Sequence, residues 1–277
     1  MNYRHAFHAG NFADVMKHAA LVLMLRHLAR KDTAFRMIDA HAGIGRYNLW
    51  GPQASKTGEW VDGIGRLWGK DIPELADYLA IIAADNGGAE ALRTYPGSPR
   101  IARALLRPQD RLVLVELHPE DAKEVAEEFR GDRQVEIRQM DAYAALKAML
   151  PPPERRGLVL IDPPFEVKDE FQRVQKGLAQ ALKRWSTGTY AVWYPIKGRA
   201  PVDAFLEEVK AFGLPTLVAE LLIHDAVRDD RLNGCGLVII RPPWQLDEAL
   251  SRLLPLLWRE LGKGGGGSRV EWLVGAE

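Results

Sequence analysis

The segment 161–165, Ile-Asp-Pro-Pro-Phe, follows an apolar run and carries the residues most able to do chemistry. Its two prolines fix the backbone and remove two N–H donors, so the loop carbonyls stay available as acceptors. The Asp162 carboxylate and the Pro163 carbonyl can both accept hydrogen bonds from one amino group, and Phe165 offers a flat face to a base. An adenine amine is a poor nucleophile because its lone pair is delocalised, and two acceptors favour the pyramidal amine that attacks. The segment therefore predicts catalysis at an adenine amine, with a rigid non-catalytic loop as the alternative.

A glycine-containing turn follows an earlier apolar run, in the segment 38–45, Ile-Asp-Ala-His-Ala-Gly-Ile-Gly. Gly43 and Gly45 let the backbone turn sharply at the carboxyl end of a strand and approach a ligand closely. The third glycine of the dinucleotide-binding pattern is missing, since positions 46–48 hold none. The turn alone is a weak indication of a nucleotide-like ligand, and a tight strand-to-helix turn is the alternative.

Two further carboxylates follow apolar runs. Glu116 ends the run Leu112–Val115, and a carboxylate there can accept hydrogen bonds from both hydroxyls of a ribose. Asp141 follows the run Val135–Ile137 and could accept from an adenine amine, while the backbone N–H of Ala142 meets a ring nitrogen. The alternatives are a solvent-exposed acid at Glu116 and a helix cap at Asp141.

Strands and helices must position these residues. Apolar runs alternate with helical patterns at 119–129 and 167–185, which indicates an α/β fold with a mostly parallel sheet. A first helix is expected over residues 13–29, with Asn11 as its cap. The expected strands are Phe35–Ile38, Leu112–Val115, Val135–Ile137, Leu158–Ile161, Tyr190–Tyr194, Thr216–Leu222 and Leu237–Ile240, with Val270–Val274 as a final candidate.

One interval is too long for this alternation. Asp39 and Glu116 lie much farther apart in sequence than one βαβ unit, which takes about 30 residues. We therefore expect one domain over residues 1–277 with a helical insertion subdomain over residues 50–95, in which Pro73–Ala84 has a helical pattern.

Composition excludes several classes of protein. The 277 residues include 37 Lys+Arg and 37 Asp+Glu, a formal net charge of zero that disfavours a protein coating nucleic acid non-specifically. A single cysteine, Cys235, excludes a disulfide framework within the chain and is expected to be a small buried residue. The seven histidines show no metal-ligand spacing, so no metal is expected. Because no segment resembles a membrane span or a signal peptide, we expect a soluble, cytoplasmic protein.

Two other sets of residues have open interpretations. Arg100, Arg103 and Arg107 recur at helical spacing and could bind phosphates together with other cationic residues, with a solvated helix face as the alternative for any one of them. The other cationic residues are Arg111, Arg155, Arg156, Lys183, Arg184, Lys197 and Arg199. Trp193 and Tyr194 end an apolar run, where they could form a wall for base stacking; a place in the core is the favoured interpretation.

Most of the chain resembles one known family. The Asp162 motif is similar to the signature of S-adenosylmethionine-dependent amino-methyltransferases that act on adenine. The chain as a whole resembles the bacterial 23S ribosomal RNA adenine-N6 methyltransferase family of the RlmJ type. The family commonly has Tyr where this chain has Phe165, a change that keeps the stacking face. The segments that carry the resemblance are 3–11, 14–18, 41–47, 95–99, 116–119, 162–165 and 188–195.

The resemblance implies a Rossmann-like class I methyltransferase fold, with a seven-stranded, mainly parallel sheet and a reversed late strand. It implies S-adenosylmethionine as the cofactor, Asp162 as the catalytic acceptor, and contacts of Tyr3, Pro163 and Phe165 with the substrate. Tyr3 would lie over the site and help admit the substrate. The cofactor-binding residues implied are Lys17, His18, His41, Gly43, Ser98, Glu116, Asp141, Ala142 and Asp162.

The function expected on these grounds is methylation of the N6 amine of an adenine in 23S ribosomal RNA by a monomer. A DNA adenine-N6 methyltransferase would use the same motif, and an N-methylase of glutamine or a small molecule is also open. From a different class, a non-catalytic RNA-binding module could retain a vestigial cofactor pocket.

Overall fold

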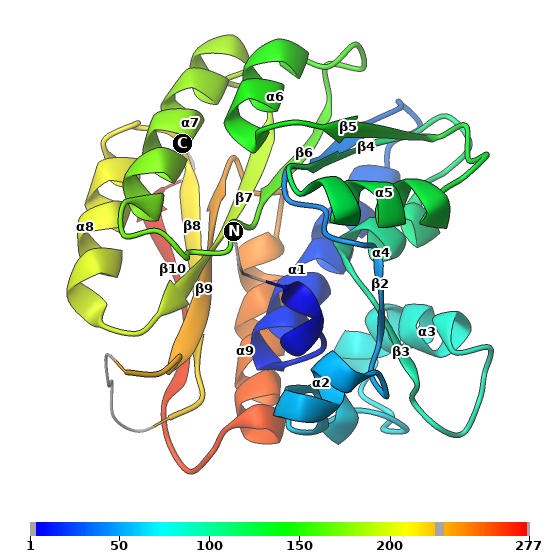
Figure 1. Cartoon of the computed structure of the whole chain (residues 1–277). Coiled ribbons are helices and arrows are strands. Elements are labelled where there is room, and N and C mark those ends of the chain that lie inside the picture. The colour runs from blue at the N-terminus through cyan, green and yellow to red at the C-terminus, as the bar shows by residue number, and fades with distance from the viewer. Residues whose placement is uncertain (1–3, 225–229, 276–277) are drawn as a thin grey trace.

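The computed structural model describes residues 4–224 and 230–275, and eight strands of this part form one sheet (Figure 1). Their spatial order is β10-β8-β9-β7-β6-β1-β4-β5, and β1, β4, β5, β6 and β7 are parallel. The strands are β1 (Arg36–Asp39), β4 (Arg111–Glu116), β5 (Val135–Gln139), β6 (Gly157–Ile161), β7 (Thr189–Ile196), β8 (Thr216–Leu222), β9 (Gly234–Ile240) and β10 (Gly267–Val274).

The α/β fold with a mainly parallel sheet is confirmed, but the expected number of strands is wrong. The resemblance implied seven strands with one reversed late strand, and β9 is indeed antiparallel to both β7 and β8. The eighth strand of the described sheet is β10, which pairs antiparallel with β8 at the edge and includes the final strand candidate Val270–Val274. An edge strand that pairs on one side can be added without disturbing the parallel core.

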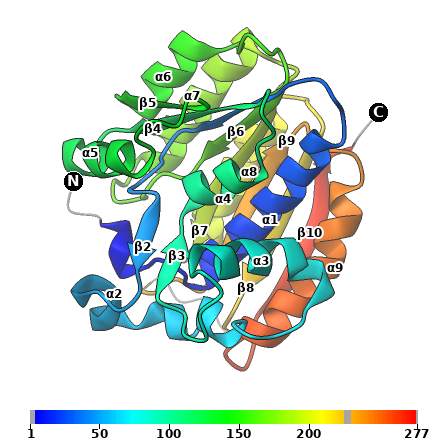
Figure 2. The ribbon, with the colours of Figure 1, turned by 90° about the vertical axis from the view of Figure 1, so that its right-hand side faces the viewer.

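Helices cover both faces of the sheet. Helices α1, α4 and α9 pack on one face, with α3 outside them, and α6, α7 and α8 pack on the other (Figure 2). All of β6 is buried, and its side chains alternate between the two cores, with Leu158 and Leu160 on one side and Val159 and Ile161 on the other. The helices are α1 (Phe12–Ala29), α2 (Pro52–Thr57), α3 (Ala76–Asp85), α4 (Ser98–Leu105), α5 (Pro119–Glu128), α6 (Ala142–Met149), α7 (Glu170–Arg184), α8 (Arg199–Lys210) and α9 (Leu246–Leu261).

Helix α1 begins where the sequence places its cap. The side-chain oxygen of Asn11 accepts hydrogen bonds from the backbone N–H groups of Ala13 and Asp14, both at 3.0 Å. The helix is buried on most sides between the sheet and its neighbours, which explains its long apolar sequence. Its first turns bring Lys17 and His18 to the carboxyl ends of the parallel strands.

The interval between β1 and β4 holds α2, α3, short 3-10 turns and a two-stranded sheet of β2 (Arg46–Asn48) and β3 (Thr94–Pro96). The glycine turn therefore leads into a strand and not into the helix that the sequence suggested as an alternative. Apolar side chains of the interval, including Leu75, Tyr78 and Ile82, belong to the same core as α1. That shared core supports one domain, while the boundaries of the insertion at 50 and 95 stay a prediction.

The Asp162 motif and the other strand-end acids lie at one edge of the sheet. In the order β4, β1, β6 and β7, the parallel strands end at Glu116, Asp39, Ile161 and Ile196. In the sheet, β4 and β5 lie on one side of β1, and β6 and β7 lie on the other. The order in which the chain adds strands therefore reverses at β1. Ligands of open α/β sheets bind at such a point, outside the carboxyl ends of the strands.

Candidate active site

A cavity of about 670 Å³ opens at this edge of the sheet. It is within the usual size range for a small-molecule or cofactor site. Every site residue expected from the sequence lines it, except Tyr3, which lies outside the described residues. The eleven residues brought together are Lys17, His18, His41, Gly43, Ser98, Glu116, Asp141, Ala142, Asp162, Pro163 and Phe165.

Residues 162–165, called here the Asp162 tip, are held in a fixed geometry. The backbone N–H of Asp162 donates to Nδ1 of His41 at 3.2 Å. Burial lowers the pKa of His41 to about 4, so the ring is neutral and remains an acceptor at neutral pH. Phe165 has a φ of 50°, in the left-handed region that non-glycine residues rarely occupy. Such strain persists where the surroundings determine the conformation, as at active sites.

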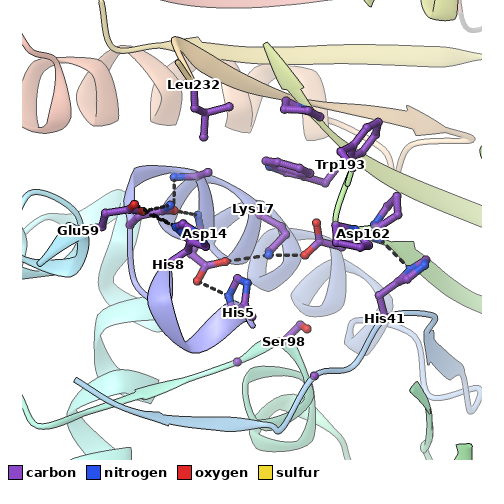
Figure 3. Close-up of a pocket in the computed structure, with 18 of the residues that line it drawn as sticks. His5, His8, Asp14, Lys17, His41, Glu59, Ser98, Asp162, Trp193 and Leu232 are labelled. Carbon is purple, nitrogen blue, oxygen red and sulfur yellow. Dashed lines mark hydrogen bonds and ion pairs between the residues drawn. The ribbon is translucent and has the colours of Figure 1, made fainter. Parts of the chain in front are cut away.

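The Asp162 carboxylate is paired with a lysine from the first helix. Nζ of Lys17 donates to Asp162 and, at 2.8 Å, to Asp14 (Figure 3). Burial opposes the charge of Lys17, but the two carboxylates raise its pKa well above the usual range. Asp14 also contacts Nε2 of His5 at 2.9 Å. The tip therefore lies next to a fixed positive charge that faces the cavity.

His18 is set deeper in the same wall. Its Nδ1 lies 2.7 Å from the hydroxyl of Tyr95, which in turn lies 2.9 Å from the hydroxyl of Tyr78. Burial lowers the pKa of His18 well below its usual value, so the ring is neutral. A neutral ring close to Lys17 adds no second positive charge to the site.

The glycine turn and Glu116 form a cradle on the other side of the cavity. The backbone N–H groups of Gly43 and His118 donate to the two carboxylate oxygens of Glu116, each at 2.8 Å. Burial raises the pKa of Glu116 even though these hydrogen bonds favour its charged form. Gly43 has a φ of 59°, and a Cβ there would lie 2.3 Å from the hydroxyl of Tyr47. Only glycine fits this turn without displacement of the tyrosine.

The residues present fit S-adenosylmethionine. Each Glu116 oxygen accepts one backbone hydrogen bond in the structure and keeps capacity for a second, as a pair of ribose hydroxyls requires. Asp141 caps α6 by accepting from the N–H of Ala144 at 3.0 Å, so the cap that the sequence left open is present. Its other oxygen lies 3.6 Å from Arg173, and both residues line the cavity.

Ser98 begins α4 and is buried beside Asp39. Burial raises the pKa of Asp39 to about 6, an effect that the neighbouring Ser98 side chain and the N–H of His41, which donates at 3.3 Å, only partly offset. The sequence analysis gave Asp39 no role of its own. Its position at the end of β1, between Glu116 and Asp162 in the strand order, makes it part of the wall behind the cavity.

We predict that Asp39→Asn raises the free energy of unfolding at pH 8 by about 2–3 kcal/mol. At pH 5 the difference in free energy of unfolding between the variant and wild type should be about half as large. The pKa of Asp39 is about 6 in the folded protein and near the ordinary value in the unfolded chain. The folded state therefore binds the proton more tightly, and stability is lost as the pH rises through about 6. Urea denaturation at several pH values measures this difference, with exposed Asp77→Asn as the control. An equal stability of the Asp39 variant and wild type at pH 8 would contradict it.

Sequence reasoning gave Asp14 no role in the site and favoured a place in the core for Trp193. Asp14 joins His5 to Lys17, and its spacing of three from Lys17 places both on one helix face, a signal that was available. Trp193 is only half-buried and lines the cavity, with its ring 5.9 Å from that of Phe165, whereas Tyr194 is in the core as expected. No local sequence pattern indicates that Trp193 and Phe165, which lie far apart in the chain, line the same cavity.

The three arginines that recur at helical spacing are used in ion pairs. Arg100 pairs with Asp85 and Glu128, and Arg103 pairs with Asp132. Arg107 pairs with Asp110 at 2.9 Å and also donates to backbone carbonyls. These contacts hold α4 and the loop after it to neighbouring elements, so this set is structural.

The part of the chain that the structure describes contains neither a metal-binding cluster nor a membrane-spanning helix. Within residues 4–224 and 230–275, no group of three or more His, Cys, Asp or Glu side chains is arranged to hold a metal ion. None of the helices in the same ranges is long and apolar enough to cross a membrane.

Comparison with known proteins identifies the family. A family model described as ribosomal RNA large subunit methyltransferase D, RlmJ, matches residues 32–274. The chain is 44% identical to ribosomal RNA large subunit methyltransferase J of Haemophilus influenzae and 42% identical to that of Escherichia coli, each over 99% of both chains. A crystal structure of protein LPL1258 from Legionella pneumophila superposes with a TM-score of 0.89 at 34% identity, covering 96% of this chain and 98% of that one. The chain therefore belongs to the RlmJ family of ribosomal RNA large subunit methyltransferases.

Proposed function

We propose that this chain transfers a methyl group from S-adenosylmethionine to the N6 amine of an adenine in 23S ribosomal RNA. Family membership supports an rRNA methyltransferase that uses this cofactor. The observation that carries the proposal is the placement of the Asp162 tip in the same cavity as the Glu116 cradle. A methyl donor held by Glu116 and an amine held by Asp162 would therefore lie in the same cavity, with no part of the protein between them.

The cofactor would occupy the part of the cavity near β1, β4 and β5. Glu116 would accept from the ribose hydroxyls, and Asp141 with Ala142 would hold the adenine. When bound, S-adenosylmethionine supplies a methyl group that its sulfonium makes electrophilic. The remaining cofactor contacts would come from Lys17, His18, His41, Gly43, Ser98 and Asp162.

The Asp162 tip would orient the amine and take its proton. The carboxylate of Asp162 and the carbonyl of Pro163 would accept from the amine, while the ring of Phe165 stacks on the base. As the bond from N6 to the methyl carbon forms and the carbon–sulfur bond breaks, Asp162 would accept the proton that the amine loses. Lys17 would turn from Asp162 toward Asp14, which it already contacts, and so free an acceptor oxygen.

The substrate base must leave its helix to reach the tip, because a stacked base cannot enter a cavity of this kind. On the family resemblance, we propose that Tyr3, which lies outside the described residues, helps to admit the base. We propose that the protein acts as a monomer. Ribosomal RNA as the substrate assigns the activity to the cytoplasm.

Transfer of tritium from labelled S-adenosylmethionine tests the proposal. We expect label in a 23S ribosomal RNA transcript and none in double-stranded DNA of matched length. Label in DNA alone would favour a DNA adenine methyltransferase. Label in neither nucleic acid would favour an N-methylase of another substrate. RNA binding without cofactor affinity by calorimetry would indicate a non-catalytic module.

A further inference from the structure

The cavity extends well beyond the Asp162 tip, on the side away from the Glu116 cradle. Residues from the end of β7, from the segment before β9 and from the segment after α9 line this extension. No residue assigned to the cofactor lies there. A flipped nucleotide remains attached to its strand, so the base at Asp162 must be followed by a sugar and phosphates that leave through part of the cavity.

One face of β7 runs from the tip into this extension. Trp193, Pro195 and Lys197 line the cavity, whereas Tyr194 and Ile196 between them are buried on the other side. This alternation is the period of two expected for side chains along an extended strand. The register pairs Ile161 with Val192, so Trp193 stands at the level of Asp162. At about 3.3 Å per residue, Lys197 lies about 13 Å farther along the strand.

One buried residue of the extension contacts the backbone of Lys197 and the side chain of Arg231. Asn233 is fully buried, and its side-chain nitrogen donates to the backbone carbonyl of Lys197 at 2.7 Å. Its side-chain oxygen accepts from Nε of Arg231 at 3.0 Å. Its backbone N–H donates to Ile196, and its carbonyl accepts from Ile223. The ends of β7 and β8 and the side chain of Arg231 are thus fastened together.

The other charged groups of the extension are paired or exposed. Asp62 pairs with Arg66 at 3.0 Å and with Lys263 at 2.7 Å. Glu59 contacts His8 and Asn11, and Asp230 is an exposed acid next to Arg231. Among the described residues, the ammonium of Lys197 and the terminal nitrogens of Arg231 have no such acidic partner. These two groups are therefore available to an anionic ligand.

We propose that Lys197 and Arg231 bind the RNA phosphates that flank the target adenosine, with Asn233 as the residue that fixes the backbone of Lys197 and the side chain of Arg231. The inference rests on the proposed function and names the part of the RNA that this end of the cavity recognises. The same face of β7 then offers an aromatic ring to the base and an ammonium to its backbone. Contacts with phosphates fix the register of a nucleic acid without reading its sequence.

Kinetics of Lys197→Ala with a 23S ribosomal RNA transcript test this proposal. We expect the KM for RNA to rise about tenfold at moderate salt, because the variant loses one charge-assisted contact. The kcat should change less than about twofold. The slope of log KM against log salt should fall by about 0.7, the value for one contact with single-stranded RNA. Lys197→Arg should restore both quantities in large part. Arg231→Ala should act in the same direction as Lys197→Ala.

The matched control is Lys183→Ala, which removes an exposed lysine at the end of α7, outside the cavity. An unchanged dissociation constant for S-adenosylmethionine shows that each variant is folded. If the KM and salt slope of the Lys197 variant equal those of the Lys183 variant, the phosphate site is overturned. If wild type itself transfers no methyl group to RNA, the proposed function fails, which is a distinct result.

Discussion

Asp162→Ala should lower kcat for methyl transfer by at least about 10³-fold, because the change removes both the acceptor that orients the amine and the base that takes its proton. The cofactor should still bind, since the Glu116 cradle and the glycine turn on the other side of the cavity are untouched. Lys17 would keep Asp14 as its partner, so no unpaired charge is left in the core. Single-turnover transfer and calorimetry measure the two quantities separately.

Asp162→Asn refines this test. The amide keeps the shape of the side chain and one acceptor oxygen but cannot take a proton at neutral pH. We expect its kcat to fall nearly as far as that of the alanine variant. Asp203→Ala removes an exposed carboxylate on α8 and should leave transfer unchanged. An Asp162→Ala enzyme within about tenfold of wild type would show that this residue is not the catalytic acceptor.

Glu116→Ala should weaken binding of S-adenosylmethionine by at least about 100-fold, since hydrogen bonds to a charged group contribute about 1.5–3 kcal/mol each. The variant would lose the two ribose contacts and also the acceptor that holds the N–H groups of Gly43 and His118. The turn that forms the cradle would then lose its anchor. Calorimetry with the purified protein gives the dissociation constant.

Two further variants separate the ribose contacts from a general loss of structure. In Glu116→Gln one oxygen becomes an NH₂ group, which cannot accept a hydrogen bond. The side chain can then no longer accept from both Gly43 and His118, so cofactor binding should weaken in this variant too. Glu127→Ala removes an exposed carboxylate on α5 and should bind the cofactor as wild type does. An unchanged dissociation constant in Glu116→Ala would remove Glu116 from the cofactor site.

Much of this architecture follows from local sequence patterns. Asn11 and the apolar spacing after it predict the first helix to within one residue of its start at Phe12. Each apolar run expected as a strand overlaps a strand of the sheet, although Phe35 lies just before β1. The acids and the proline tip follow these strands directly, so their convergence at one edge results from parallel pairing alone.

The rest depends on contacts between distant parts of the chain. The strand after the glycine turn, β2, has three residues and pairs with β3 near residue 95, so no local periodicity marks it. The pairing of Lys17 with Asp162 joins residues 145 positions apart. The arginine spacing on α4 was visible, but only the fold shows that acids of other elements already bind these side chains. The role of Trp193 depended in the same way on which face of β7 borders a cavity.

The central claim is that the Asp162 tip receives the N6 amine of adenine beside a bound methyl donor. Nucleoside mass spectrometry of a 23S ribosomal RNA transcript, treated with the enzyme and trideuteromethyl S-adenosylmethionine, tests it most directly. The account predicts that the deuterated methyl group appears in N6-methyladenosine, and that Asp162→Ala abolishes this product. Label on a ribose hydroxyl, on a ring nitrogen of adenine or on another base would contradict it.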